Sequence, residues 1–244
     1  MKYRFVLMAL ALVLVLSAIS ASAAPPPSRA RNAVKPKADP SAVFAEITDD
    51  PKLPRVLLIG DSISMGYTFP VRRMLAGKAN VHRVPMNGGD TARGLDQLDA
   101  WLGEKPWDVI HFNFGLHDLK HMKNGRADPR GDQVRSPEEY AENLDKLVVR
   151  LKATGATLIW ATTTPVPAGA GNRVAGDEIL FNNAAAKIMK RHGVKVNDLC
   201  TYVAPHLAKY QYRRNVHFNP KGSEFLGRKV ADAISAVLAE RGGR

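Results

Sequence analysis

The feature that most constrains this chain is a short apolar run that ends directly on a polar turn. Val56 to Ile59 are four consecutive apolar residues, and Gly60-Asp61-Ser62 follow them without a break. A continuous apolar run of this length is typical of a strand buried on both faces of a parallel sheet. Open α/β sheets bind their ligands at the carboxyl ends of such strands. Ser62 is therefore placed where a reactive hydroxyl is useful, although the same turn also suits the cap of a following helix.

The rest of the chain alternates between apolar strand-like segments and helix-like segments, joined by short connections. Further strands are predicted at residues 81–84, 109–114, 157–163 and 194–196, and helices at 70–77, 94–102, 136–154, 177–191 and 219–241. This alternation favours a parallel sheet with helices on both faces. We therefore expect an α/β fold, specifically a flavodoxin-like three-layer α/β/α sandwich with a five-stranded parallel sheet.

The N-terminus predicts export. Two basic residues precede an unbroken apolar run over residues 5–16, and small residues with the pattern Ala21-Ser22-Ala23 follow. This order is typical of a cleaved signal peptide, here residues 1–23, and the run is short for a membrane-spanning anchor, which is the competing interpretation. Residues 24–54 are rich in Pro, Ala and Lys and are predicted to be a flexible linker. Residues 55–244 then form one domain, in a protein that is secreted or periplasmic.

Charge and cysteine content narrow the expected partners. The formal net charge is +12, and the predicted signal peptide holds only two of the basic residues and no acidic one. A chain this basic attracts polyanions such as acidic polysaccharides or anionic lipid surfaces. Export and the lack of a recognition motif argue against nucleic acid, and no stable membrane insertion is expected once the signal is cleaved. The single cysteine, Cys200, allows no intramolecular disulfide and is expected to be a small buried residue.

Four groups of polar residues are predicted to meet at one rim of the sheet. Ser62, Gly88-Gly89 and His117-Asp118 follow predicted strands, and His217 precedes the last helix. A serine becomes a nucleophile when a neutral imidazole takes its proton. The oxyanion that results needs preorganised donors, which backbone N–H groups at Ser62 and at a glycine turn can supply. The remaining histidines show no metal-ligand spacing, so neither a metal nor a cofactor is expected.

These motifs resemble those of the SGNH, or GDSL-like, hydrolases, a family of serine esterases and lipases. Gly60-Asp61-Ser62-Ile63-Ser64 is similar to the first family motif, Gly88-Gly89-Asp90-Thr91 to the second, Gly115-Leu116-His117-Asp118 to the third, and the segment 216–222 to the last. The resemblance implies that Ser62 is the nucleophile and His217 the base. It also implies that Ser62, Gly89 and His117 form the oxyanion hole.

The sequence departs from the family pattern at two positions. The third motif usually has an asparagine where this chain has His117, whose ring N–H can also donate a hydrogen bond. The triad acid usually lies three residues before the histidine, where this chain has Arg214. A guanidinium cannot orient the imidazole or stabilise its protonated form as a carboxylate does. Three explanations stay open: a dyad oriented by a backbone carbonyl or by Asn215, another carboxylate such as Asp198, or a decayed site.

Basic residues flank the predicted site. Lys120 and Lys123 follow His117, and Arg213 and Arg214 precede His217. They are either a solvated loop surface or a cationic collar that selects an anionic substrate. The sequence thus predicts an exported serine esterase that removes short acyl groups, most simply from a carbohydrate. The alternative is a catalytically silent domain that binds an acidic glycan or a cell-envelope polymer.

Overall fold

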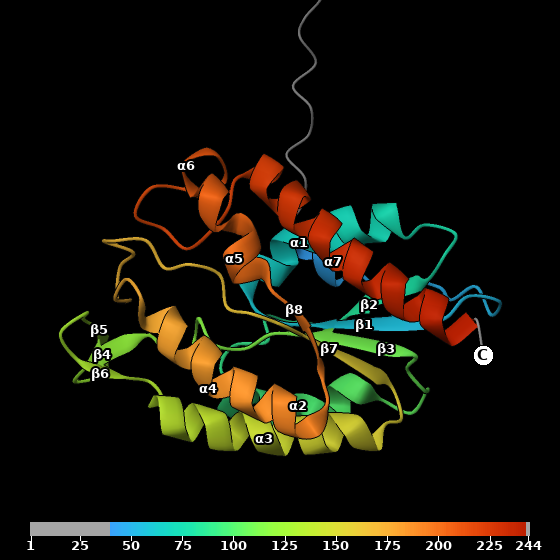
Figure 1. Ribbon diagram of the computed structural model, residues 1–244, viewed down its shortest axis with the longest axis horizontal. Helices are drawn as coiled ribbons and strands as arrows, with labels where there is room; N and C mark the ends of the chain where they lie inside the picture. The colour runs from blue at the N-terminus through green and yellow to red at the C-terminus, as the bar shows by residue number, and fades with distance from the viewer. Residues whose placement is uncertain (1–39, 243–244) are drawn as a thin grey trace, which may run out of the picture. The chain divides into compact units, whose positions relative to one another are not determined.

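A five-stranded parallel sheet forms the centre of the protein (Figure 1). The computed structural model describes residues 40–242. The strands lie in the order β2-β1-β3-β7-β8, and all their pairings are parallel. Their bounds are β1 Arg55–Ile59, β2 Asn80–Arg83, β3 Val109–Phe112, β7 Thr157–Ala161 and β8 Lys195–Asn197. This is the flavodoxin-like strand order, so the predicted fold class is confirmed, and its chain reversal lies between β1 and β3.

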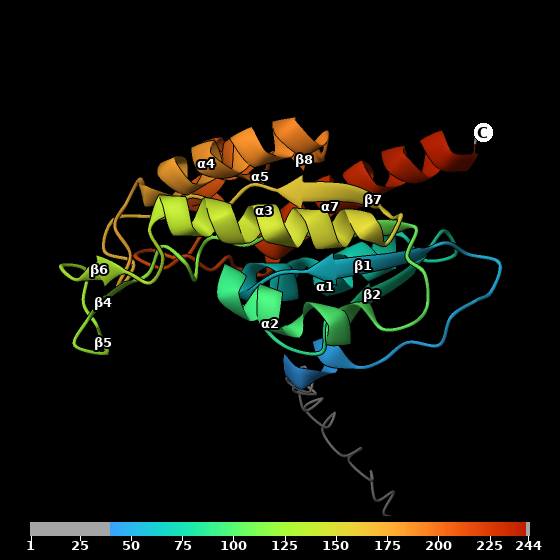
Figure 2. The ribbon, with the colours of Figure 1, turned by 90° about the horizontal axis from the view of Figure 1, so that it is seen from below.

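Helices cover both faces of this sheet. Helices α1 (Ser62–Met74) and α7 (Pro220–Gly242) pack together on one face, whereas α2 (Thr91–Leu102), α3 (Pro137–Ala153) and α4 (Asp177–His192) pack on the other (Figures 1 and 2). Between β8 and α7, the chain forms the short helices α5 (Leu199–Val203), η2 (Ala204–His206) and α6 (Leu207–Tyr210). In the described residues, no helix is long and apolar enough to cross a membrane.

The apolar run that leads to Ser62 is the most deeply buried part of the sheet. The side chains of Val56, Leu57, Leu58 and Ile59 are all at most 1% exposed. Full burial of such a side chain contributes about 1.5–3 kcal/mol, so β1 is firmly anchored at its carboxyl end. The serine that follows it is thereby held on a rigid support.

Helix α1 differs from the prediction for this segment. A helix was expected at 70–77 with Pro70 in its first turn, but the helix begins at Ser62 and Pro70 lies inside it. Pro70 is buried against α7, where a Cβ added to Gly227 would lie 2.6 Å from the Pro70 Cβ. Tight packing of α1 on α7 therefore overrides the usual cost of an interior proline.

The predicted linker was wrong in its last part. Residues 1–39, which include the predicted signal peptide, lie outside the described residues. From residue 40 onward, however, the chain packs on the domain through the 3₁₀ helix η1 (Pro40–Phe44). Asp49 accepts a hydrogen bond from Arg55 Nε and pairs with His82. Asn80 accepts from the Asp50 backbone N–H and donates to the Asp50 carbonyl. Proline content suggested a mobile segment because it does not reveal these side-chain partners.

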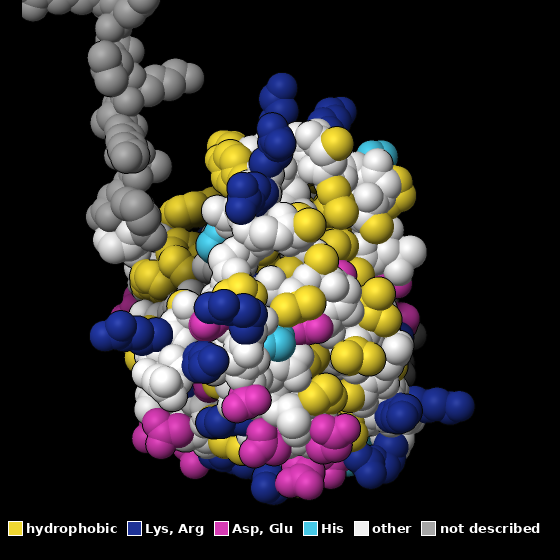
Figure 3. All heavy atoms as spheres, turned by 90° about the vertical axis from the view of Figure 1, so that its left-hand side faces the viewer, with side chains coloured by type: hydrophobic (Ala, Val, Ile, Leu, Met, Phe, Trp, Pro, Cys, Tyr) yellow, Lys and Arg dark blue, Asp and Glu magenta, His cyan; other side chains and the backbone are white. Residues whose placement is uncertain are grey.

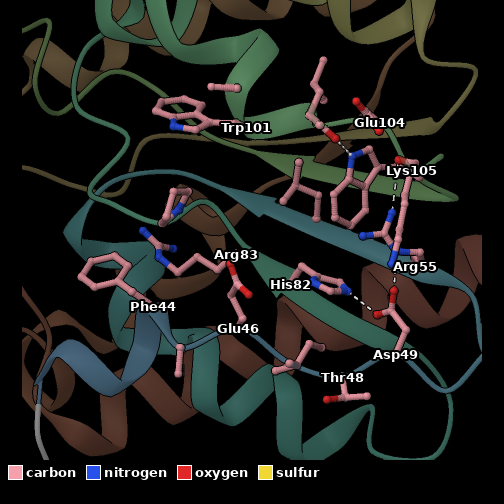
Figure 4. Close-up of a pocket in the computed structure, with 18 of the residues that line it drawn as sticks. Phe44, Glu46, Thr48, Asp49, Arg55, His82, Arg83, Trp101, Glu104 and Lys105 are labelled. Atoms are coloured by element: carbon pink, nitrogen blue, oxygen red, sulfur yellow. Dashed lines mark hydrogen bonds and ion pairs between the residues drawn. The ribbon is translucent and has the colours of Figure 1, made fainter.

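This N-terminal segment, residues 40–54, closes one side of a cavity of about 500 Å³ at the β2 edge of the sheet (Figure 4). The Phe44 ring lies beside the Arg83 guanidinium at 5.7 Å from its centroid, and Arg55 lies over the Trp107 ring at 3.9 Å. The edge strand is thus covered, which removes an exposed template for strand pairing.

A second small sheet forms in the polar segment after His117, where only a loop was predicted. Its strands are β4 (His121–Lys123), β5 (Arg126–Ala127) and β6 (Asp132–Gln133), in the order β5-β4-β6. Strands this short carry too little apolar patterning to be recognised from sequence.

Candidate active site

Ser62 is the first residue of α1 and lies at the carboxyl end of β1. The preceding residue, Asp61, caps the helix, because its Oδ1 accepts a hydrogen bond from Ile63 N at 2.9 Å. The capping role and the position of Ser62 at the rim therefore coexist. The Ser62 backbone N–H has no partner among the described residues. It lies at the positive end of the helix dipole, which favours negative charge at this point.

Arg83, on β2, binds the turn that carries Ser62. This role of Arg83 was not predicted from the sequence. Its Nη2 donates to the Gly60 carbonyl at 2.8 Å, and its Nη1 donates to Ser64 Oγ at 2.5 Å. Burial lowers the pKa of Arg83 to about 10, so the group stays charged at neutral pH. The buried guanidinium is tolerated because hydroxyl and carbonyl oxygens accept from both Nη atoms, although its Nε is buried without a partner. No clear signal for this role was present in the sequence, because β2 also contains the polar residues Asn80 and His82.

His217 lies within hydrogen-bond distance of the serine. The Ser62 Oγ and His217 Nε2 atoms are 2.8 Å apart. On the other side of the ring, His217 Nδ1 is 2.7 Å from Asn215 Oδ1, which also accepts the His217 backbone N–H at 3.0 Å. The two residues predicted as nucleophile and base are thus brought together, although 155 positions separate them in the sequence.

The contacts of Asn215 determine the tautomer of His217. A backbone N–H can only donate, so the Asn215 atom that faces it is the amide oxygen. The same oxygen must then accept from His217 Nδ1, which therefore carries the ring proton. This leaves Nε2 with a lone pair directed at the Ser62 hydroxyl, as a general base requires.

The carboxylate candidate Asp198 does not take the place of the triad acid. Asp198 caps α5, and its Oδ1 accepts from Thr162 Oγ1 and Thr201 N, both at 3.0 Å. The prediction that Asp198 is a substitute acid is not supported, because its carboxylate is used by α5 rather than by His217. Arg214 adopts a left-handed conformation with φ 52°. Asn215, the predicted orienting residue, makes the contact instead.

The three predicted oxyanion donors differ in availability. The N–H of Gly89 donates to Asn87 Oδ1 at 3.0 Å, and that of Gly88 donates to the Gly60 carbonyl at 2.9 Å. The N–H of Ser62 is unoccupied. His117 receives a hydrogen bond from Lys120 Nζ at its Nδ1, at 3.0 Å. Gly89 therefore contributes to an oxyanion hole only when its N–H is shared with, or released by, Asn87.

The fold and this site match known proteins. The family model described as GDSL-like Lipase/Acylhydrolase family matches residues 58–225, which span the serine turn and all the motif loops. The chain belongs to this family. No curated protein matches the sequence. The resemblance seen in the motifs is thereby confirmed at the level of the family.

Solved structures share the fold at low sequence identity. The lipase/acylhydrolase from Enterococcus faecalis has a TM-score of 0.64 and 21% identity over 75% of this chain and 96% of its own. The acetyl xylan esterase AlAXEase has a TM-score of 0.62 and 16% identity over 74% of this chain and 99% of its own. TesA has a TM-score of 0.59 and 18% identity over 75% and 99%. At these identities the structures establish the fold alone.

The basic residues of the predicted collar are not equivalent in this GDSL-like hydrolase. Figure 3 shows the side of the molecule at which the parallel strands end, with basic side chains over its upper and middle parts and acidic ones along its lower edge. Arg213 and Arg214 are exposed in the loop before His217, and Lys123 is exposed on β4. Lys120 is half-buried and bound to His117.

Within residues 40–242, no group of three His, Cys, Asp or Glu side chains is arranged to hold a metal ion.

Asp118 links the second and third motif loops. Its Oδ1 accepts from Thr91 N at 2.9 Å and Thr91 Oγ1 at 2.5 Å, while its Oδ2 is buried without a partner. Burial raises the pKa of Asp118 to about 7, because the Thr91 hydrogen bonds offset only part of the desolvation. The carboxyl group thus joins the N-terminus of α2 to the loop that carries His117.

This raised pKa predicts a pH-dependent stability. Between about pH 4 and pH 7 the folded state binds more protons at Asp118 than the unfolded state, so this group destabilises the fold as the pH rises through that window. In Asp118→Asn the amide oxygen can still accept from Thr91, but nothing titrates. We expect the variant to gain up to about 1.4 kcal/mol per pH unit relative to wild type across the window. Denaturant unfolding at pH 5 and pH 8 measures this, and a constant difference between the two proteins would refute it.

A second prediction concerns Asn215. Removing its amide in Asn215→Ala deletes one neutral hydrogen bond, worth about 1 kcal/mol, so kcat should fall by roughly five- to tenfold. Asn215→Asp places a carboxylate at Nδ1, where a charge-assisted bond stabilises the imidazolium. We expect kcat to rise and the acidic limb of the rate profile to move to higher pH. Identical profiles for wild type and Asn215→Asp would show that another group orients His217.

Proposed function

We propose that this GDSL-like hydrolase is an exported serine esterase that cleaves short-chain carboxylic esters, with acylated carbohydrate as the substrate class. The observation that carries the proposal is the ordered chain from Ser62 Oγ to His217 Nε2 and from His217 Nδ1 to Asn215 Oδ1. Each atom in this chain has the donor or acceptor role that acyl transfer requires.

The reaction follows from these roles. Ser62 Oγ attacks the ester carbonyl carbon while its proton passes to His217 Nε2. The imidazolium then protonates the leaving alkoxide as the carbon–oxygen bond breaks, which leaves an acyl group on Ser62. A water molecule gives its proton to His217 and attacks the acyl carbonyl. Collapse of this second intermediate releases the carboxylic acid and restores the serine.

In both steps negative charge develops on the carbonyl oxygen. The unoccupied Ser62 N–H at the start of α1 is one donor to this oxygen, and the His117 ring is the second. Such a donor typically contributes about 2.7–4 kcal/mol to the transition state. The Asn amide at Nδ1 orients the imidazole without adding negative charge, so the protonated histidine is stabilised less than beside a carboxylate. We therefore expect an active but slow enzyme.

The carbohydrate part of the proposal rests on the predicted signal peptide and on the basic surface. AlAXEase, a solved structure of similar fold, is an acetyl xylan esterase. Arg213 and Arg214, exposed in the loop before His217, would attract a glycan ester that carries carboxylate or sulfate groups. Turnover of an anionic ester should then fall with rising salt more steeply than that of a neutral ester. Equal salt responses would remove the anionic preference and leave the esterase itself standing.

The decisive experiment combines covalent labelling with turnover. Purified wild type is incubated with a fluorophosphonate probe and, separately, with an activated acetyl ester and an acetylated polysaccharide. We expect labelling and ester hydrolysis by wild type, and neither by Ser62→Ala. Wild type that neither labels nor turns over would overturn the proposal in favour of the alternative, a silent domain that binds an acidic polymer. The Asn87 contact to Gly89 N–H and the position of Asn215, an amide, at His217 Nδ1 favour that alternative.

A further inference from the structure

Lys120 and His117 form a contact that fixes where the histidine carries its proton. The Lys120 ammonium has N–H donors and no acceptor, so at 3.0 Å it donates to His117 Nδ1. The Nδ1 atom must then present its lone pair. The single proton of the neutral ring is therefore on Nε2.

His117 is neutral at physiological pH. Burial lowers the pKa of this histidine to about 4. The positive charges of Lys120 and Arg173 also lower this pKa, whereas the negative charges of Asp61 and Asp90 raise it. A neutral imidazole in solution exchanges between its two tautomers. Only the tautomer with the proton on Nε2 offers a donor there, because the other presents a lone pair that would repel an oxyanion.

The Nε2 atom is available. It has no hydrogen-bond partner in the part of the chain that the structure describes. Unlike Nδ1 of His111, it is not a fully buried atom. Gly89 N–H is already bonded to Asn87. A hydrogen bond from His117 to the oxyanion is therefore more important here than in a site where the glycine N–H is free to donate as well.

The loop holds both partners in place. Leu119, between them, is fully buried, and its N–H donates to the Gly115 carbonyl at 2.9 Å. The Lys120 carbonyl accepts from Val134 N at 2.7 Å. The backbone positions of both residues are thereby fixed, which keeps the Lys120 side chain within reach of the His117 ring.

We propose that Lys120 is a positioning residue that holds His117 in its Nε2–H tautomer and so makes a histidine act as the oxyanion donor. This inference rests on the proposed function. It differs from the collar prediction, in which Lys120 contacts the substrate.

A double-mutant cycle tests the proposal. In Lys120→Met, kcat for an uncharged acetyl ester should fall by about 10- to 100-fold, since an oxyanion donor is worth roughly 10²–10³ in kcat, while KM stays nearly constant. His117→Asn supplies an amide donor that needs no tautomer, as in the usual family motif. In that background Lys120→Met should change kcat less than twofold. Lys146→Met, at an exposed lysine on α3, is the matched control and should leave kcat unchanged in both backgrounds.

A second measurement does not depend on activity. Nitrogen-15 NMR of the His117 ring should show a protonated Nε2 and an unprotonated Nδ1 in wild type at pH 7. In Lys120→Met the two nitrogens should move toward the averaged shifts of mixed tautomers. Assignment comes from the resonances that His117→Asn lacks.

The outcomes separate the two proposals. Equal loss of kcat by Lys120→Met in both backgrounds, or a change in KM alone, would overturn the inference and assign Lys120 to substrate binding. A protonated Nδ1 in wild type would overturn it as well. If wild type neither labels with fluorophosphonate nor turns over, the proposed function fails, and the NMR result still decides whether Lys120 sets the tautomer.

Discussion

Replacing His217 with alanine is expected to lower kcat for an activated acetyl ester by at least about 10⁴-fold, because serine and histidine act as one unit in acyl transfer. The Ser62 hydroxyl would lose its only proton acceptor, Nε2 at 2.8 Å. His217 is exposed, so the free energy of unfolding should change little. Steady-state kinetics together with a thermal melt measure both effects.

The matched control is His192→Ala. This histidine lies at the end of α4 and pairs with Asp145 on α3, away from the strand ends that carry the site. It should retain full turnover with a loss in stability of at most about 1 kcal/mol, as expected of a surface ion pair. If His217→Ala retained more than a hundredth of wild-type kcat, a base other than His217 would have to be sought.

The sequence was sufficient to predict the sheet, because its signals are local. The apolar run at Val56 to Ile59 indicated a doubly buried strand, and Gly60-Asp61-Ser62 marked the point where it ends. The alternation of strands and helices then favoured a parallel sheet with helices on both faces. The family motifs placed Ser62 and His217 at one rim, and the structure brings these two side chains to hydrogen-bond distance.

The hydrogen bonds that hold the site in place could not be predicted from the sequence, because they join residues that are distant along the chain. Nothing local indicates that Arg83 binds the Gly60 carbonyl from 23 positions away, or that Asn87 occupies the N–H of Gly89. Position along the chain suggested Asp198 as a replacement acid, but its carboxylate is satisfied by its own helix. The position of a residue in the sequence indicates at which edge of the sheet it lies. It does not indicate which neighbouring groups form hydrogen bonds with it.

The close approach of two motif loops gives the second large expected effect, that of Gly88→Ala. The Gly88 N–H donates to the Gly60 carbonyl at 2.9 Å, and a Cβ added to Gly88 would lie 2.9 Å from that same oxygen and 3.1 Å from its carbon. Both atoms are backbone and cannot rotate away. The methyl group must therefore push apart the loop after β2 and the turn that carries Ser62.

We expect Gly88→Ala to lower kcat by about 10²-fold or more, since a shift of about 1 Å in a catalytic group has that effect. Gly77→Ala is the control: Gly77 lies in the connection between α1 and β2, its φ is +70°, and a Cβ there meets nothing within 4 Å. The control should lose about 1–2 kcal/mol of stability from its left-handed backbone and keep its kcat. Because the control is strained but remote, equal kcat losses in both variants would mean that general destabilisation, rather than displacement of Ser62, explains the effect. A loss confined to Gly88→Ala would show that catalysis depends on the separation of these two backbones.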